Sequence, residues 1–173
     1  MNDVIRTIVE RRSCKKYDSE KMLPETDLAQ ILEAGSWAAS GNGKQSPAMV
    51  VVQDPETRDL LARLNAEVLG VSSDTFYGAP VVVNVFADSN VPTYVEDGSL
   101  VLGNLMVAAT ALDIGSCWIH RAKEVFQTEE GRALMEKWGL PENFVGVGHC
   151  VLGYAAGPLP KGKARKEGYI RYV

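Results

Sequence analysis

The sequence is poor in the residues that build metal sites and disulfide frameworks. It has three cysteines and two histidines, and no two cysteines are spaced as C-x-x-C. An odd number of cysteines without a zinc-like spacing is typical of a protein in a reducing compartment. We therefore expect no metal ion, no structural disulfide and a cytoplasmic location.

The sequence also lacks a segment that could enter a membrane. A strongly apolar stretch, residues 98–112, is shorter than the roughly 20 residues that span a bilayer. The first residues contain no apolar signal segment, because Arg6, Glu10 and Arg11 interrupt them. We expect no contact with a membrane and no secretory signal.

Internal repeats and low-complexity segments are absent as well. The chain has 173 residues, of which 46% are hydrophobic and 23% are charged. This composition suits one globular domain with a core of its own. We expect a single domain over residues 1–173.

The net charge of -4 is unevenly distributed. Residues 1–21 carry six basic and four acidic side chains, and residues 161–171 carry five basic side chains and one acidic side chain. A nucleic-acid-binding protein more often has one broad basic face, so we expect no such partner. Two basic ends on an acidic body favour the binding of one small anion by both ends, although solvated lysines and arginines give the same pattern.

The segment that organises the chain runs from Asp97 to His120. Residues 98–112 leave no polar face, and a helix that is apolar all round is expected to be buried all round. Asp97 and Ser99 are candidate N-caps for this helix. A short apolar run follows, and then the polar pair His120 and Arg121, where a functional site is expected.

The spacing of apolar residues predicts helices and strands in alternation. Helical spacing occurs near residues 4–9, 25–32, 55–64 and 128–138, and β-favouring runs occur near residues 48–52, 81–87, 116–119, 145–152 and 169–173. Residues 39–47 have the composition of a loop, and residues 66–77 show little pattern. This order predicts an α+β or α/β domain with a central sheet, to which residues 169–173 add an edge strand.

Three familiar motifs do not fit the chain. Residues 41–45, GNGKQ, lack the Ser or Thr that follows the lysine of a phosphate-binding P-loop, and this loop precedes a strand instead of a helix. Gly146 and Gly148 lack the third glycine of a dinucleotide-binding turn. A nucleophilic pair of Cys117 or Cys150 with a histidine is disfavoured, because buried cysteines are mostly inert.

Five short motifs follow one another along nearly the whole chain. Residues 11–17 read RRSCKKY and residues 39–47 read ASGNGKQSP; the others are residues 76–80, residues 115–119 after the central helix, and residues 148–154 before a basic tail. Together they resemble the nitroreductase family of FMN-dependent oxidoreductases. That family opens with R-[RH]-S-x-[RK]-x-[FY] and has a P-S-x-x-N-x-Q-P-W loop, with which Ser40 and Gln45 are in register.

The resemblance implies an α+β fold whose central sheet is mixed, mainly antiparallel and flanked by helices. It implies an intertwined homodimer that binds FMN at its interface, with the C-terminal tail, residues 155–173, reaching the partner subunit. A dimer core also explains the all-apolar central helix, and an obligate pair of this kind would bury roughly 2,000 Å² or more.

The resemblance also implies a set of cofactor-binding residues. Arg11 and Ser13 would contact the phosphate or the ribityl chain, and Arg12 and Lys15 the ribityl chain or the ring edge. Ser40 and Gln45 would contact the flavin from the other subunit. The remaining members are Lys163 and Arg165 on the phosphate, and Ile119, His120 and Arg121 with backbone amides toward the reactive ring edge.

Physical chemistry agrees with these assignments. A phosphate dianion removed from water needs charge-assisted donors, which arginine supplies bidentately. A cation such as Lys15 or Arg12 beside the pyrimidine edge would stabilise reduced flavin. The chemistry then belongs to the cofactor, so we expect ping-pong kinetics and no catalytic protein nucleophile.

Two positions depart from the family pattern. Ser46 and Pro47 replace the usual P-W, so the aromatic residue is missing. His120 and Arg121 replace a pair that more often contains glycine. We hypothesise that His120 tunes the redox potential or donates a proton to substrate; the alternative is that only its backbone matters. Arg121 and Lys44 are candidate contacts for the 2'-phosphate of NADPH, with surface solvation as the alternative.

The function that this resemblance implies is an oxidoreductase that takes a hydride from NADH or NADPH. Its acceptors would be nitroaromatics, quinones or related electron-poor molecules, reduced two electrons at a time. A flavin-binding storage or regulatory protein without turnover is the alternative. Another flavin reaction, such as dehalogenation or dehydrogenation, also fits, because membership of a family does not fix the chemistry.

Overall fold

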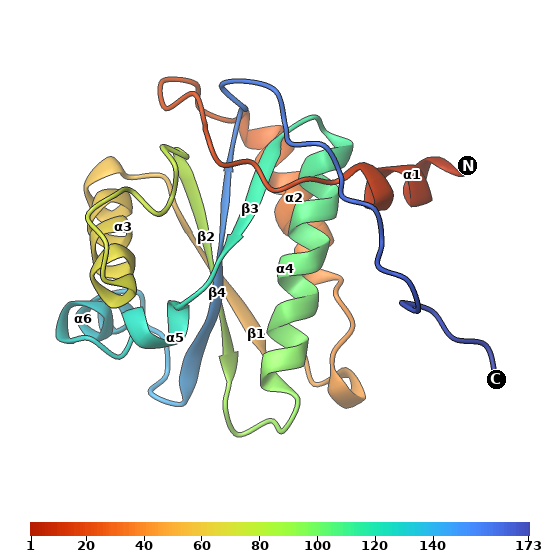
Figure 1. The fold of residues 1–173 in the computed structure, drawn as a ribbon. Helices are drawn as coiled ribbons and strands as arrows, with labels where there is room; N and C mark the ends of the chain where they lie inside the picture. Colours follow the sequence, from red (N-terminus) through yellow and green to blue (C-terminus); the bar gives the residue numbers. More distant parts are fainter.

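The computed structural model describes residues 1–173 and contains one four-stranded sheet (Figure 1). Its strands are β1 (Pro47–Val52), β2 (Val81–Asp88), β3 (Gly115–Ile119) and β4 (Phe144–Gly153), in the spatial order β1-β2-β4-β3. All three pairings are antiparallel. The prediction of an α+β fold with a mainly antiparallel sheet is confirmed, and the parallel component is limited to an isolated bridge between Ser13 and Ser116.

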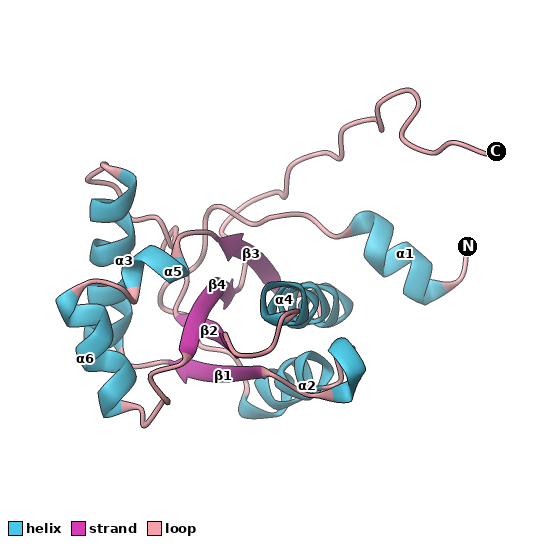
Figure 2. Cartoon of the chain, turned by 90° about the horizontal axis from the view of Figure 1, so that it is seen from below, coloured by secondary structure: helices cyan, strands magenta, loops and turns pink.

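Helices cover both faces of the sheet (Figure 2). One face carries α2 (Glu25–Ser36) and α4 (Tyr94–Ala111), and the other carries α3 (Pro55–Leu69), α5 (Ala122–Val125) and α6 (Glu129–Lys137). The short helix α1 (Asp3–Glu10) lies beyond α4 in both views. None of the helices is both long and apolar enough to cross a bilayer.

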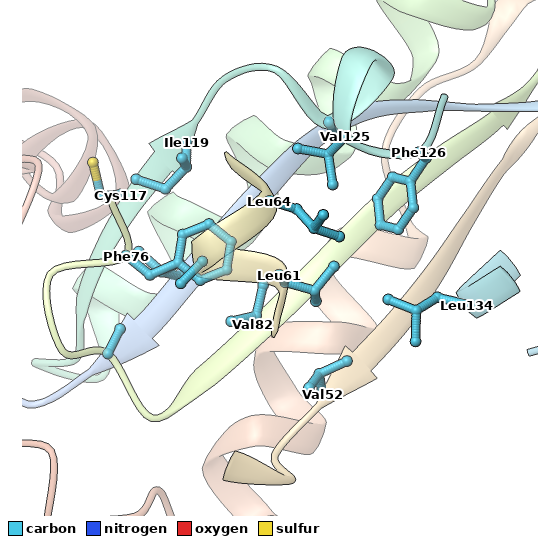
Figure 3. Packing of buried hydrophobic residues seen from close by; sticks show 14 of the residues in the cluster. Val52, Leu61, Leu64, Phe76, Val82, Cys117, Ile119, Val125, Phe126 and Leu134 are labelled. Atoms are coloured by element: carbon cyan, nitrogen blue, oxygen red, sulfur yellow. The ribbon is translucent and has the colours of Figure 1, made fainter. Parts of the chain in front are cut away.

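Strand β2 supplies side chains to two separate cores because successive residues point to opposite faces. Val82 and Phe86 face α3, whereas Val81 and Val83 face α4. Figure 3 shows the core on the α3 side, where Leu61, Leu64 and Phe76 gather above the sheet. The side chains on both faces of the sheet are therefore mainly apolar, and the exposed polar groups lie at its edges and strand ends.

Local sequence signals explain where several helices begin and end. The Asn2 side chain accepts a hydrogen bond from Val4 N at 2.9 Å, and Asp54 accepts one from Thr57 N at 2.9 Å ahead of Pro55. Helix α3 ends at Gly70, whose φ of 79° is left-handed. The starts of α1 and α3 match the predicted positions, whereas the end at Gly70 was not predicted, because α3 continues through residues 66–69, where little pattern was expected.

Helix α4 differs from the prediction in its start and in its burial. It begins at Tyr94, so neither Asp97 nor Ser99 is its N-cap. The carboxylate of Asp97 bonds to a distant loop, and Ser99 Oγ donates to the Val95 carbonyl oxygen within the helix. Within one chain α4 is covered on the faces toward the sheet and α2, while Leu100 stays 48% exposed.

Three further differences concern short or terminal segments. The four-residue helix α5 and the 3-10 turn at Gly41–Gly43 were not predicted, because such short elements have no periodicity to detect. Residues 169–173 form no strand, so the predicted edge strand is wrong for this chain. The outer edge of β3 is met instead by the N-terminal segment, through the bridge from Ser13 to Ser116.

His149 is one of the buried polar groups of the core on the α3 side. It faces Asn84 in the register of β2 and β4, and its Nδ1 lies 2.7 Å from Asn84 Oδ1. The rings of Phe76 and Phe126 lie 5.3 Å and 5.7 Å from its ring, centroid to centroid. Burial lowers the pKa of this imidazole from 6.5 to about 3, so the folded protein holds it neutral.

We expect His149 to make the fold sensitive to mild acid. The unfolded chain takes up a proton on this residue below about pH 6.5, whereas the folded protein does so only near pH 3. Because the unfolded state binds more protons between these values, the free energy of unfolding falls as the pH falls. From pH 7 to pH 5 the expected loss from this group is about 2 kcal/mol, measured by guanidinium chloride unfolding at fixed protein concentration.

Two histidine variants separate this contribution from the rest of the acid dependence. His149→Leu should lose it, while His120→Gln, which changes an exposed side chain, should keep it. An unfolding free energy that falls as steeply in His149→Leu as in the parent protein would contradict the prediction.

Candidate functional site

The basic residues near the N-terminus lie in an extended segment beside β3. Cys14 N donates to the Ser116 carbonyl oxygen at 2.9 Å, next to the bridge between Ser13 and Ser116. Cys14 and Tyr17 are buried, whereas Lys15 between them is exposed. The apolar side chains thus anchor the segment in the core and leave its cations at the surface.

The start of the C-terminal tail lies against this segment. Tyr17 bridges to Ala155, and Ala156 N donates to the Lys16 carbonyl oxygen at 3.0 Å. Between the two segments is an open hollow of about 650 Å³, lined by residues 13–16 and 156–160. The Arg12 guanidinium lies directly against Gly162, so a side chain at position 162 would have to displace it. The two basic ends of the chain therefore meet in space.

The cations of these two segments have no acidic partners. None of the predicted phosphate or ring-edge cations forms an ion pair with a carboxylate of the chain; they are Arg11, Arg12, Lys15, Lys163 and Arg165. Arg12 Nη1 donates to the carbonyl oxygens of Val9 and Arg11, at 2.8 and 2.7 Å. Arg165 Nη2 donates to the Lys163 carbonyl oxygen at 2.7 Å.

Arg11 is the cation of this group with a buried donor that has no acceptor. Its Nη1 is buried and has no hydrogen-bond partner in the chain. A buried guanidinium donor without an acceptor is costly, and an anionic oxygen would relieve that cost. The donor set around Arg11 therefore fits a phosphate group.

The second predicted group, Ser40 and Gln45, lies in the loop between α2 and β1. Ser40 Oγ accepts a hydrogen bond from Gln45 N at 2.9 Å, so the loop closes on itself. Asn42 and Gln45 adopt left-handed backbone conformations with φ of 53° and 50°. The structure therefore brings these two predicted residues together.

Asp97 ties this loop to the first turn of α4. Its carboxylate accepts hydrogen bonds from Gly41 N at 2.9 Å, Ser46 Oγ at 2.6 Å and Thr93 Oγ1 at 3.3 Å. Burial alone would raise the pKa of Asp97, but the hydrogen bonds outweigh it and the pKa lies below 3.8. Sequence reasoning assigned Asp97 to a helix cap and missed this role; a lone carboxylate at the start of an apolar helix was the available signal.

The third predicted group is at the end of β3. Ile119 is buried, the His120 side chain is exposed, and Arg121 has a left-handed φ of 76°. From α3, Asn65 Nδ2 donates to the His120 carbonyl oxygen at 2.7 Å. No sequence motif singled out Asn65.

The loop and the basic ends do not meet within one chain. The loop is bonded to Asp97 in the first turn of α4, whereas the basic segment lies beside β3, which follows the C-terminal end of α4. Asp97 and Ala111 are separated by about 20 Å along the helix axis. Ser40 and Gln45 therefore cannot join Arg11 at one site of the same chain.

The cysteines do not form a nucleophilic centre. Cys14, Cys117 and Cys150 are all buried and unpaired. Burial raises the pKa of the Cys117 thiol, and burial likewise raises the pKa of Cys150. The Cys117 and Cys150 thiols are therefore neutral near pH 7. No three His, Cys, Asp or Glu side chains lie close enough together to hold a metal ion.

Comparisons with known proteins agree with this arrangement. The sequence model described as "Nitroreductase family" matches residues 8–73 and 69–154. A Bacteroides fragilis nitroreductase crystallised with bound FMN is 33% identical, with a TM-score of 0.90 over 100% of both chains. An Archaeoglobus fulgidus protein provisionally named NADH dehydrogenase/NAD(P)H nitroreductase is 31% identical over 160 residues, which are 89% of this chain and 86% of its own. A Desulfitobacterium hafniense nitroreductase with bound FMN, 24% identical with a TM-score of 0.88 over 100% of this chain and 99% of its own, shares the fold.

We expect Asp97→Ala to loosen the loop of residues 40–46. Two donors from the loop would lose a buried acceptor, which should lower the free energy of unfolding by about 1–3 kcal/mol at pH 7. Hydrogen exchange of the loop amides should accelerate more than that of β2. The contribution should be fully present above pH 3.8 and disappear as the pH falls through the lower pKa of the folded protein.

Glu96→Ala is the matched control, because Glu96 lies in the same turn and its side chain is exposed. Equal effects of the two substitutions on stability and loop exchange would show that the Asp97 hydrogen bonds do not hold the loop.

Proposed function

Because the chain belongs to the nitroreductase family, we propose that it is an FMN-dependent NAD(P)H oxidoreductase that reduces nitroaromatics, quinones or related electron-poor acceptors. The observation that carries this proposal is the unpaired, buried Nη1 of Arg11 among cations that have no carboxylate partners. FMN is bound in the crystal structure of the Bacteroides fragilis relative. The phosphate of FMN is an anion of the kind that this donor set fits.

The residues that would hold FMN come from three parts of the chain. Arg11, Ser13, Lys163 and Arg165 would bind the phosphate end, and Arg12 and Lys15 would lie toward the ribityl chain and the ring. Ser40 and Gln45 would come from a second subunit, and residues 119–121 would present backbone amides to the reactive ring edge. The chemistry that FMN supplies when bound is uptake of a hydride from NADH or NADPH and delivery of two electrons to the acceptor.

The part of this chain in the reaction is to bind, orient and stabilise charge. Lys15 Nζ lies 5.9 Å from the centre of the Tyr77 ring and forms no ion pair, so its charge is available to a reduced ring. The buried Cys117 and Cys150 thiols, whose pKa values are raised, offer no nucleophile. The exposed His120 side chain remains a hypothetical modulator of potential or proton supply.

A second copy of the chain would complete this site as a homodimer. Helix α1 leaves four apolar side chains 53–64% exposed: Val4, Ile5, Ile8 and Val9. Leu100 on α4 is also exposed, and the tail carries exposed Tyr169, Ile170 and Tyr172 away from the body (Figures 1 and 2). Several large apolar side chains exposed together on one short helix, as on α1, are typical of a protein interface. Pairing would bring Ser40 and Gln45 of one subunit to Arg11 of the other.

The first experiment is a visible absorption spectrum of the purified protein reconstituted with FMN, followed by anaerobic NADH and then NADPH. We expect about one FMN per chain and bleaching by at least one of the two donors. Arg11→Ala should raise the FMN dissociation constant about 10- to 100-fold, because a charge-assisted hydrogen bond contributes about 1.5–3 kcal/mol.

Arg132→Ala is the control for this substitution, since Arg132 is an exposed arginine on α6, on the other face of the sheet. Protein that stays colourless with added FMN would overturn the proposal. Bound FMN that neither donor bleaches would favour the storage or regulatory alternative.

We expect Ile8→Asp to dissociate the homodimer. A charge in the exposed apolar row of α1 would be buried without a partner on pairing, which costs several kcal/mol. Sedimentation velocity should show a dimer for the parent protein and a monomer for the variant. FMN affinity should fall in parallel, because Ser40 and Gln45 would no longer reach the partner's site.

Gln127→Asp adds the same charge at an exposed position away from α1 and should leave the dimer intact. The melting temperature of the parent should also rise with protein concentration. A parent protein that sediments as a monomer at micromolar concentration would contradict the proposed assembly.

A further inference from the structure

Asn65 is a polar residue in an apolar part of the core. It lies on α3 with an exposed fraction of 0%, and its neighbours Leu61 and Leu64 are buried to a similar degree. Its Nδ2 donates to the His120 carbonyl oxygen at 2.7 Å, while its Oδ1 is buried without a partner. Burying an amide with one end unsatisfied is unfavourable, so the residue needs an explanation other than packing.

The hydrogen bond from Asn65 fixes the orientation of one peptide group. In a planar trans peptide the C=O and N–H bonds point in opposite directions. The His120 carbonyl points inward to Asn65, so the N–H of Arg121 points outward. This N–H donates no hydrogen bond within the chain. The end of β3 therefore presents the Arg121 N–H as a free backbone donor, and the hydrogen bond from Asn65 to the His120 carbonyl sets its direction.

The conformation at Arg121 also needs support. Its φ of 76° and ψ of 15° lie in the left-handed region, which glycine adopts readily and arginine does not. A side-chain bond to the preceding carbonyl holds the peptide in place where the residue itself would favour another conformation. Asn65, on the neighbouring helix α3, thus stabilises a left-handed backbone conformation that a glycine at position 121 would adopt without such support.

We propose that Asn65 is a positioning residue that, through the His120 carbonyl, aims the Arg121 N–H at the reactive edge of the flavin ring. This inference rests on the proposed function, because it requires FMN beside residues 119–121. A donor held in a fixed direction stabilises negative charge on the reduced ring without having to reorganise when that charge develops. Asn65 does not touch the ring and acts only through the backbone.

The competing role is a structural tie between α3 and the end of β3. A tie would affect stability alone, whereas a positioning role changes the relative affinity for reduced and oxidised FMN. The decisive measurement is therefore the two-electron reduction potential of the bound flavin, by anaerobic titration against a reference dye. The dissociation constant of oxidised FMN and the thermal stability are measured on the same samples.

Two variants of Asn65 test the proposal. Asn65→Leu removes the donor and keeps the number and branching of the side-chain heavy atoms, but it leaves the His120 carbonyl oxygen without this donor, so some loss of stability is expected as well. We expect the affinity for reduced FMN to fall about tenfold more than the affinity for oxidised FMN, which lowers the potential by about 30 mV. Asn104→Leu is the matched control, because Asn104 Nδ2 likewise donates to a carbonyl, that of Ala34, at 2.9 Å. It should leave the potential unchanged.

Asn65→Asp tests the donor directly. Burial raises the pKa of such a carboxyl group, so the neutral acid, which can donate its O–H to the His120 carbonyl, is favoured at the lower pH, whereas the carboxylate that forms as the pH rises has no proton to donate. The potential should equal that of the parent at pH 6 and lie below it at pH 9. This comparison keeps the test decisive if Asn65→Leu does not fold.

The outcomes separate the two proposals. If both variants have the potential of the parent at each pH, the inference about Asn65 is overturned while FMN binding stands, even if they melt at lower temperature. If the parent protein itself binds no FMN, the proposed function is overturned and this inference with it.

Discussion

The packing of α4 against the sheet sets the position of every part of the candidate site. This helix is buried along the sides that face β2, β4 and α2, through residues such as Val101, Leu102 and Leu105. Its first turn is bonded to the loop that carries Ser40 and Gln45, and its C-terminal end leads directly into β3. Because a close-packed helix cannot slide, the loop and the β3 edge are held at a fixed separation.

The central sheet and most of its helices could be predicted from the sequence because their signals are local. Apolar runs bounded by Pro47, Pro80 or Gly115 gave the strands, and caps such as Asn2 and Asp54 gave helix starts. The tail was mispredicted, since β-favouring residues form a strand only where a sheet edge is free. The family was also predictable, because its motifs are short and contiguous.

The residues that hold the site in place, Asp97 and Asn65, could not be predicted, because they act through contacts that are distant in sequence. Asp97 acts on Gly41 and Ser46 across more than fifty positions, and Asn65 acts on His120 across 55. Neither residue differs by type or spacing from an ordinary cap or helix residue. The left-handed backbone at Arg121 likewise has no signal in the sequence, because tertiary contacts impose it on a residue that does not favour it. The assignments of Arg11, Ser40 and their companions to FMN remain predictions.

The strand order also has a consequence for how the chain folds. β4 comes last of the four strands along the sequence, yet it lies inside the sheet between β2 and β3. Before residues 144–153 are synthesised, β2 and β3 have no common partner and each leaves an apolar edge unpaired. The sheet closes by contacts that are distant in sequence, which is typical of slow folding. A nascent chain that ends before β4 thus exposes the strands that the finished protein buries most completely.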